Sequence, residues 1–191
     1  TLRIPSDRVG LVYHGVDVQR AQYRSKRDRI LETWSGKFLF TAGSIYAYRG
    51  IEDIIYACER LQQKGKIYYI AIAGLIGQGM QKYYEHLKHM ILAKGLDAHI
   101  RFLGTITRKE MTWCYRNCAA FLMTSRVEAC PNTALEAIAH RCLCISTNCS
   151  PMPEILAESA QYYRPGDSAA LGTCIENTLH WSLDMTYRED E

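Results

Sequence analysis

No hydrophobic run in this sequence is long enough to cross a membrane. The longest, at residues 67–76, falls well short of the ~20 apolar residues that a membrane-spanning helix requires. The start of the chain also lacks the apolar core of a secretory signal peptide, because Arg3 and Pro5 closely follow Thr1. We therefore expect a soluble chain.

The sequence also lacks a large excess of one charge. It has 23 basic and 20 acidic side chains and a formal net charge of +3, which is too small to predict a surface for nucleic acid or for a membrane. An early basic cluster, at residues 20–29, is interrupted by Asp28 and favours an ordinary solvated face. With 48% hydrophobic residues, the composition excludes a disordered chain and indicates a globular domain.

Cysteine is too sparse for a disulfide-stabilised secreted domain. The eight cysteines among 191 residues fall below the roughly 8–10% that is typical of such scaffolds. Cys142, Cys144 and Cys149 lie close together in the chain, but there is no C-x-x-C pair to support a zinc site. We expect free thiols in a cytosolic protein.

Short apolar runs alternate with helical patterns along almost the whole chain. The runs predict strands at Val9–Tyr13, Lys37–Ala42, Ile67–Ala73, His99–Leu103, Ala119–Met123, Cys142–Ser146 and Gln161–Tyr163. Apolar residues at three- and four-residue spacing predict helices over residues 51–61 and 80–91. Local signals predict the starts of four more helices. These signals are a capping box formed by Thr107 and Glu110, Pro131 and Pro153 in first turns, and Asp167 as an N-cap.

This alternation predicts an α/β fold, namely a doubly wound, Rossmann-like parallel sheet with helices on both faces. Residues 36–182 form the expected domain. We interpret residues 1–35 as a linker or lead-in strand and helix, and residues 183–191 as the start of a C-terminal tail or crossover helix. In such sheets ligands bind beyond the carboxyl ends of the strands, so the chemistry should lie in the segments that follow them.

The segment after the first domain strand combines glycine with a cation. It runs from Gly43 to Gly50, and Arg49 stands just before a helix N-terminus, where an anion can bind. A solvated arginine without a ligand explains Arg49 equally well. The next segment, Gly74–Gly79, is not a G-x-G-x-x-G motif and favours a plain turn. Gly104 opens a third segment, which suits either close backbone approach to a base or a simple turn.

The segment after the fourth domain strand is the most informative. Pro131 at a helix start leaves the amides around Asn132 and Thr133 without intrahelical acceptors, so they are available to an anion. Glu128 and Glu136 flank these amides. Two carboxylates would repel phosphate, so their natural ligands are hydroxyl groups of a sugar or a ribose. A pair of hydrolytic carboxylates, or plain surface charge, stays open at this point.

These residues resemble a known family. Glu128 and Glu136, within EACPNTALEA, resemble the E-x7-E motif of glycosyltransferase family 4 (group 1), which consists of retaining glycosyltransferases of the GT-B fold. Other pieces stand in the family's order, and these are VYHGVD, GSIYAYRG, IAGLIGQG, IRFLGTIT and PMPEIL. The resemblance covers nearly the whole chain, from about Val9 to Trp181.

The resemblance implies one half of a two-domain GT-B fold. The chain resembles the C-terminal, donor-binding half, so a partner N-terminal acceptor-binding domain is expected in a longer polypeptide. The donor would be a nucleotide-diphosphate sugar. By position, Glu136 would bind the ribose, Glu128 would contact the transferred sugar near the reacting centre, and Arg49 would neutralise the diphosphate. Further donor-binding positions implied are Gly43, Ser44, Asn132, Thr133 and, for the base, Gly104, Thr105 and Ile106.

The absence of a D-x-D motif fits an enzyme of this family that needs no metal or cofactor. The resemblance further implies a cytoplasmic enzyme of surface polysaccharide or glycolipid synthesis, inactive without its acceptor half and in contact with the membrane only through that half. Whether the nucleotide is UDP or GDP, and which acceptor is used, stays open. Two alternatives remain, a non-catalytic nucleotide-binding module and a sugar-nucleotide epimerase of the same fold.

Three departures from the family pattern bear on the site. Ser44 stands where many members carry a second phosphate-binding Arg or Lys, so Arg49 and backbone amides would carry more of the binding. Arg141 replaces the usual glycine after the E-x7-E helix, and Cys149-Ser150 replaces a frequent Gly-Gly pair. These side chains would reshape the site locally.

Overall fold

The computed structural model describes residues 38–186, with side chains as far as residue 179, together with Pro5, Arg8, Gly10, Val12, Gly15 and Val16. The expected strand at Val9–Tyr13 and the helix-like stretch before Gly36 lie mostly outside the described residues. The division of the chain at residues 35 and 182 therefore stays a prediction.

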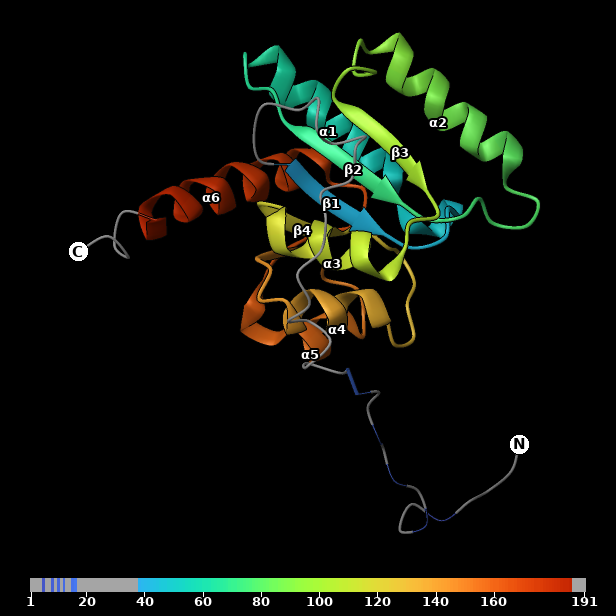
Figure 1. Cartoon of the computed structure of the whole chain (residues 1–191), viewed down its shortest axis with the longest axis vertical. Coiled ribbons are helices and arrows are strands. Elements are labelled where there is room, and N and C mark those ends of the chain that lie inside the picture. Colours follow the sequence, from blue (N-terminus) through green and yellow to red (C-terminus); the bar gives the residue numbers. More distant parts are fainter. Residues whose placement is uncertain are drawn as a thin grey trace.

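Six strands alternate with helices in residues 38–186 (Figure 1). The strands are β1 (Phe38–Ala42), β2 (Tyr69–Ala73), β3 (Ile100–Gly104), β4 (Ala120–Met123), β5 (Cys144–Thr147) and β6 (Ala160–Tyr163). The α-helices are α1 (Ile51–Gln63), α2 (Gln81–Ala93), α3 (Arg108–Asn117), α4 (Asn132–Ala139), α5 (Met152–Leu156) and α6 (Ser168–Thr186), and short 3-10 helices are η4 (Ala47–Arg49) and η5 (Ala157–Ser159). Each strand was predicted in its place, with bounds that differ by one or two residues.

All five strand pairings are parallel, and the order across the sheet is β3-β2-β1-β4-β5-β6. This order confirms the predicted doubly wound α/β fold. The chain moves outward from β1 to β3 and then returns to add β4 on the other side of β1, where Leu39 pairs with Ala120. The carboxyl ends of β1 and β4 therefore flank the topological switch point, which is where open sheets of this kind bind ligands.

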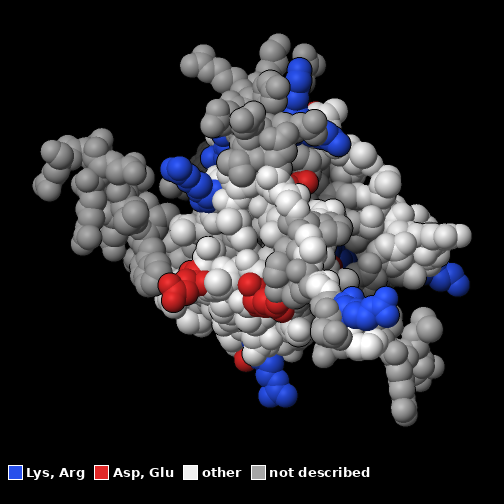
Figure 2. Space-filling view, turned by 90° about the horizontal axis from the view of Figure 1, so that it is seen from below, with Lys and Arg blue, Asp and Glu red and all other residues white. Residues whose placement is uncertain are grey.

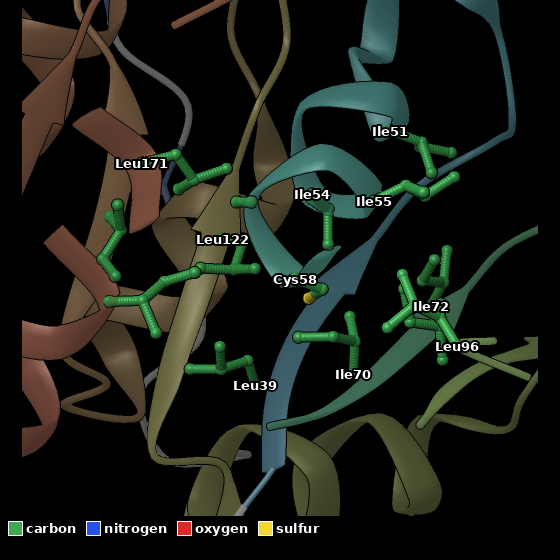
Figure 3. Packing of buried hydrophobic residues seen from close by; sticks show 14 of the residues in the cluster. Leu39, Ile51, Ile54, Ile55, Cys58, Ile70, Ile72, Leu96, Leu122 and Leu171 are labelled. Atoms are coloured by element: carbon green, nitrogen blue, oxygen red, sulfur yellow. The ribbon is translucent and has the colours of Figure 1, made fainter. Parts of the chain in front are cut away.

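Two hydrophobic clusters cover the two faces of the sheet. On one face, Leu39 and Ile70 pack with Ile54, Cys58 and Leu171 from α1 and α6 (Figure 3). On the other face, alternate residues of the same strands pack with α3, α4 and α5, through Phe38, Phe40, Phe121, Tyr115, Ala134 and Met152. Because both faces are buried, the central strands β1, β2 and β4 are apolar at almost every position, as the sequence indicated.

Local start signals agree with the structure in three of four helices. The Thr107–Glu110 capping box opens α3, and the Asp167 carboxylate accepts a hydrogen bond from the Ala170 amide at 2.9 Å at the start of α6. Pro153 lies in the first turn of α5. Pro131 was expected inside the first turn of α4, but it is the N-cap, so the helix begins at Asn132. Its fixed φ suits either position, and only the backbone ψ of 103° distinguishes them.

Most of the cysteines pack in the core or at its margin, and the charged residues are mixed on the surface. None of the eight cysteines, all of which lie in the described part of the chain, forms a disulfide, and four of them pack in or against the cluster under α3 and α4, namely Cys114, Cys118, Cys142 and Cys144. Figure 2 shows one face on which the described Lys and Arg side chains are interspersed with Asp and Glu. In the part of the chain that the structure describes, no helix is long and apolar enough to span a membrane.

Candidate functional site

The loop after β1 lies against the ends of both neighbouring strands. The Gly43 amide donates to the Ala73 carbonyl at 2.9 Å, and the Ile45 amide donates to the Leu75 carbonyl at 2.7 Å. On the other side, a Cβ atom at Gly50 would lie 2.3 Å from the Thr124 carbonyl oxygen. Gly50 also has a φ of 62°, so glycine is required here both by conformation and by space. This contact sets the position of Arg49.

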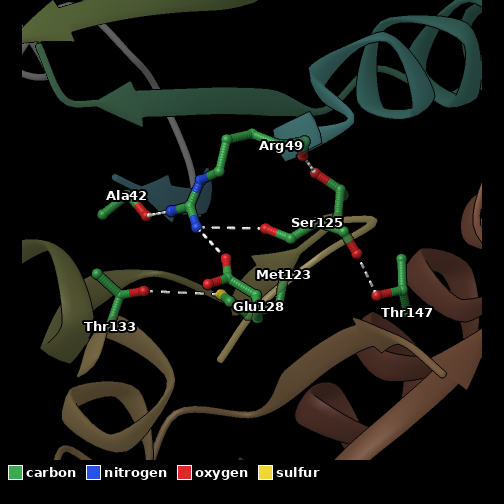
Figure 4. A network of polar contacts seen from close by, with 8 residues as sticks. Ala42, Arg49, Met123, Ser125, Glu128, Thr133 and Thr147 are labelled. Carbon is green, nitrogen blue, oxygen red and sulfur yellow. Dashed lines mark hydrogen bonds and ion pairs between the residues drawn. The ribbon is translucent and has the colours of Figure 1, made fainter. Parts of the chain in front are cut away.

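Arg49 connects the end of β1 with the loop after β4 (Figure 4). Its guanidinium donates to Ser125 Oγ at 3.2 Å, forms an ion pair with the Glu128 carboxylate, and donates to the Ala42 carbonyl. The Arg49 and Glu128 side chains are each only 14% exposed, which strengthens their attraction relative to a pair in water. A Cβ atom at Gly43 would lie 1.7 Å from Arg49 Nη2, so the guanidinium rests directly on the glycine backbone.

Hydrogen bonds hold the loop after β4 against the Arg49 loop. The Thr124 hydroxyl donates to the Arg49 carbonyl at 2.6 Å, and the Arg126 amide donates to the Tyr48 carbonyl at 2.7 Å. From β5, the Thr147 hydroxyl donates to the Ser125 carbonyl at 2.7 Å. These bonds place Ser125 and Glu128 opposite Arg49, although Arg49 and Glu128 are 79 residues apart in the chain.

Asp53 of α1 is a buried hydrogen-bond acceptor that holds the loop after β4 in place. Its carboxylate, in a residue only 3% exposed, pairs with the Arg126 guanidinium at 2.9 Å. It also accepts hydrogen bonds from the Tyr163 hydroxyl at 3.3 Å and from the Gly166 amide at 2.9 Å. Burial, together with the Asp53 charge, raises the pKa of Tyr163, so its hydroxyl stays a donor. Asp53 thereby joins α1, β6 and the loop that carries Glu128.

The first turn of α4 leaves two amides ahead of the first helical hydrogen bond. That bond runs from the Ala134 amide to the Pro131 carbonyl at 3.0 Å, so the amides of Asn132 and Thr133 precede it. Asn132 is exposed. One turn later, Glu136 is half-buried and accepts a hydrogen bond from the Tyr115 hydroxyl at 2.9 Å. The N-terminus of α4 can therefore hold an anion, with a carboxylate beside it.

The segments after β2 and β3 complete the same edge of the sheet. The Gly74 amide donates to the Gly104 carbonyl at 2.8 Å, and a Cβ atom at Gly74 would lie 2.0 Å from the Gly43 carbonyl oxygen. Three loops therefore run backbone against backbone. Thr105 is exposed, and Ile106 packs against the cluster that contains Tyr115.

Not all of the predicted site residues meet. The structure brings Gly43, Arg49 and Glu128 together, and it places the remaining predicted residues along the same edge of the sheet, on α4 and after β3. The Ser44 side chain is exposed and adds no charge there. A small cavity of about 10 Å³ beside Arg49 is lined by Gly43, Met123, Thr124 and Ser125 among others, and it is large enough for one water molecule.

Sequence reasoning missed three residues with a clear part in this geometry, namely Asp53, Tyr115 and Ser125. Asp53 stands in the first turn of α1, where an acid is ordinary, and Tyr115 lies within α3 without any local pattern that points to a ligand. Ser125 carried a usable signal, because a hydroxyl two residues beyond the end of a buried strand lies at the binding edge of a parallel sheet. Among the residues that the structure describes, no group of three or more His, Cys, Asp or Glu side chains could hold a metal ion.

Comparison with known proteins gives a family match over most of the chain. The family model described as "Glycosyl transferases group 1" matches residues 24–180. No curated protein sequence matches.

Solved structures share the fold. The C-terminal domain of a group 1 glycosyl transferase, LpcC from Francisella tularensis, is 24% identical with a TM-score of 0.73, and the match covers 87% of this chain and 88% of that domain. A glycosyltransferase from Rickettsia africae is 19% identical with a TM-score of 0.81, covering 93% of this chain and 48% of that one. HepE from Anabaena, solved in complex with UDP, is 19% identical with a TM-score of 0.75, covering 91% and 50%. The chain thus spans about half the length of the last two proteins.

Proposed function

This chain belongs to the group 1 glycosyl transferases, and we propose that it is the donor-binding half of a retaining enzyme that transfers the sugar of a UDP-sugar or GDP-sugar to a glycan or lipid-linked acceptor, with UDP or GDP as the leaving group. The observation that carries the proposal is the meeting of Arg49 and Glu128 at the switch point between β1 and β4, where Glu128 lies on the loop that leads into the first turn of α4. A cation with free amides suits a diphosphate, and a carboxylate beside them suits sugar hydroxyls.

In this proposal Arg49 and the amides of Asn132 and Thr133 bind the donor diphosphate. The diphosphate gains negative charge as it leaves, and donors that are already in position lower the barrier for that step. Arg49 is paired with Glu128 here. The incoming diphosphate therefore competes with the Glu128 carboxylate for the guanidinium, and the displaced carboxylate becomes an acceptor for hydroxyls of the transferred sugar.

Glu136 binds the hydroxyls of the nucleotide ribose, and the backbone of Gly104, Thr105 and Ile106 meets the base. Gly104 has a φ of 65° and nothing within 4 Å of an added Cβ atom, so the base can approach this backbone closely. The acceptor hydroxyl attacks the anomeric carbon on the face from which the diphosphate leaves, which preserves configuration. Protein groups carry the charge stabilisation in this scheme, without a metal.

The acceptor is bound by a second, N-terminal domain of the same polypeptide. Support for this comes from similar structures about twice as long as this chain, and from LpcC, since the structure that this chain matches over 88% of its length is that protein's C-terminal domain. We place the complete enzyme in the cytoplasm, in the synthesis of surface polysaccharide or glycolipid, with any membrane contact made by the N-terminal domain.

Titration calorimetry of the 191-residue chain with UDP and with GDP tests the donor site. We expect one nucleotide to bind and Glu136→Ala to abolish that binding. Binding of both nucleotides unchanged in Glu136→Ala would contradict the ribose role. Ser44 supports one other candidate, a non-catalytic nucleotide-binding module, because a second cation is missing at that position. Sugar transfer by the complete polypeptide, lost in Glu128→Ala while the nucleotide still binds, would exclude that candidate.

A further inference from the structure

Tyr115 is a fully enclosed side chain with a polar group beside α4. The residue is 2% exposed, and its ring contacts Phe40 and Phe121, with centroids 5.3 Å away in each case. The His140 ring stacks on it at 5.1 Å with an interplanar angle of 22°. A ring packed on several sides keeps a single rotamer, so the direction of its hydroxyl is set by the fold.

The backbone of Tyr115 is held as firmly as its ring. Its carbonyl oxygen accepts hydrogen bonds from the Cys142 thiol at 2.9 Å and from the Cys118 thiol at 3.4 Å. Cys118 follows the end of α3 and Cys142 follows the end of α4. The two thiols therefore tie the end of α3 to the segment that leaves α4.

The Tyr115 hydroxyl is directed at the carboxylate of Glu136. The distance from Tyr115 Oη to Glu136 Oε2 is 2.9 Å, whereas the distance to the Thr133 carbonyl oxygen is 3.4 Å. A hydroxyl has one hydrogen to donate, and the shorter contact to a charged acceptor takes it. Glu136 Oε1 makes no hydrogen bond to any other residue in the described part of the chain.

We propose that Tyr115 is a positioning residue for donor binding: its hydroxyl holds Glu136 Oε2, so that Oε1 is kept as the acceptor for a hydroxyl of the nucleotide ribose. The proposal rests on the function proposed above and goes beyond it by adding a residue of α3 to the donor site. Tyr115 does not touch the nucleotide and acts only through Glu136.

Two physical arguments support this role. A glutamate side chain has several rotatable bonds, and fixing them on binding costs free energy unless the protein has fixed them beforehand. Burial, with the Glu136 charge as the next cause, raises the pKa of Tyr115, so the hydroxyl stays protonated and remains a donor across the working pH range.

The test compares nucleotides with and without ribose hydroxyls. Tyr115→Phe keeps the ring and its aromatic contacts and removes only the hydroxyl. Titration calorimetry with UDP and with GDP, each beside its 2′,3′-dideoxy analogue, gives the ratio of the two affinities for each protein. We expect Tyr115→Phe to weaken binding of the hydroxyl-bearing nucleotide about tenfold and to leave the dideoxy analogue unchanged. A purely structural role would weaken both nucleotides equally.

Tyr162→Phe is the matched control. It removes a tyrosine hydroxyl that donates to the Ala157 carbonyl at 2.7 Å, on β6 and outside the proposed site. Its affinity ratio should equal that of the wild-type chain. Glu136→Asp supplies a second route should Tyr115→Phe be poorly folded, because the shorter side chain keeps the charge but draws back from the Tyr115 hydroxyl. It should lower the ratio of nucleotide affinity to dideoxy-analogue affinity as Tyr115→Phe does. The double variant that combines Tyr115→Phe with Glu136→Asp should lower this ratio no further than either single variant.

The outcomes separate this inference from the proposed function. If Glu136→Ala binds the hydroxyl-bearing nucleotide as tightly as the wild-type chain does, the ribose role of Glu136 fails. If Glu136→Ala loses that binding but the affinity ratio of Tyr115→Phe equals that of the wild-type chain, the ribose role stands and the positioning role of Tyr115 is wrong.

Discussion

The Arg49 guanidinium and the Glu128 carboxylate form an ion pair that joins the loop after β1 to the loop after β4. Both groups are mostly buried, and Ser125 shares the same guanidinium nitrogen at 3.2 Å. The cation expected for a diphosphate is therefore already occupied by an anion of the protein. A nucleotide that binds Arg49 has to replace the Glu128 carboxylate by its own diphosphate, so variants that change Glu128 or the position of Arg49 should change nucleotide affinity.

Glu128→Gln should bind the nucleoside diphosphate more tightly than the wild-type chain. Removing the competing carboxylate frees Arg49, and we expect a gain of about fivefold, equivalent to about 1 kcal/mol. Titration calorimetry with UDP and GDP at low salt measures it, and high salt should reduce the difference. The same variant in the complete polypeptide should transfer sugar poorly. Equal or weaker nucleotide binding would show that Glu128 does not compete for Arg49.

Gly43→Ala should damage the site more than the stability of the fold. The new Cβ atom would occupy the place of Arg49 Nη2, and the φ of 137° disfavours any other residue. We expect a stability loss of about 2 kcal/mol and nucleotide binding weakened at least about tenfold as Arg49 is displaced.

Gly65→Ala is the control for Gly43→Ala. Gly65 also has a positive φ, 74°, but an added Cβ atom has nothing within 4 Å. It should cost about 1 kcal/mol in urea unfolding and leave nucleotide binding unchanged. Equal binding by the two variants would show that Arg49 has no part in binding.

Asp53→Asn should be among the most destabilising changes of a polar residue in the chain. It leaves the Arg126 guanidinium, the Tyr163 hydroxyl and the Gly166 amide without their charged acceptor. Because Arg126 is 36% exposed, we expect a smaller effect than for a fully buried ion pair. The free energy of unfolding in urea should fall by about 2–3 kcal/mol. Glu85→Gln, in the exposed pair with Lys88, should change stability by less than about 0.5 kcal/mol. Similar losses in both would contradict the role of Asp53.

Arg141→Gly should stabilise the chain. Arg141 follows α4 with a φ of 58°, and its side chain is exposed. Glycine adopts this left-handed conformation without steric cost but gains entropy in the unfolded chain, so we expect a net gain of about 0.5–1 kcal/mol. Thermal unfolding should then shift upward by about 1–4 °C. Arg141→Ala keeps the backbone penalty and should give no comparable gain; a matching gain would attribute the effect to the side chain.

The capping box of α3 predicts a pH dependence. Hydrogen bonds with the Thr107 side chain and backbone lower the pKa of Glu110 below its ordinary value of 4.5. A carboxyl group whose pKa is lower in the folded state stabilises above its unfolded pKa, and this contribution disappears as the pH falls through the folded pKa. The stability difference between the wild-type chain and Glu110→Ala should therefore be full at neutral pH and shrink below pH 4.5. A difference independent of pH in urea unfolding would contradict this.

Local patterns predicted most of the fold. Phe38–Ala42 is apolar at every position but Thr41 because each face of β1 is covered by its own cluster, and the sequence shows that burial as a nearly unbroken apolar run. The N-caps Thr107 and Asp167 were predicted because their hydrogen bonds reach only three residues. Pro131 was misplaced by one position, since proline is acceptable on both sides of a helix start.

The sequence by itself determined the alternation of strands and helices, the buried faces and the family, because these depend on periodicity and on motifs of neighbouring residues. It also indicated which loops carry charge and free amides. The partners of those groups were decided by the tertiary structure alone. Arg49 meets Glu128, Asp53 meets Arg126, and Tyr115 meets Glu136 because β4 is inserted beside β1 and α3 packs against α4. Contacts of this kind depend on the strand order and on the packing of side chains that are far apart in the sequence. No local sequence pattern encodes the strand order or this packing.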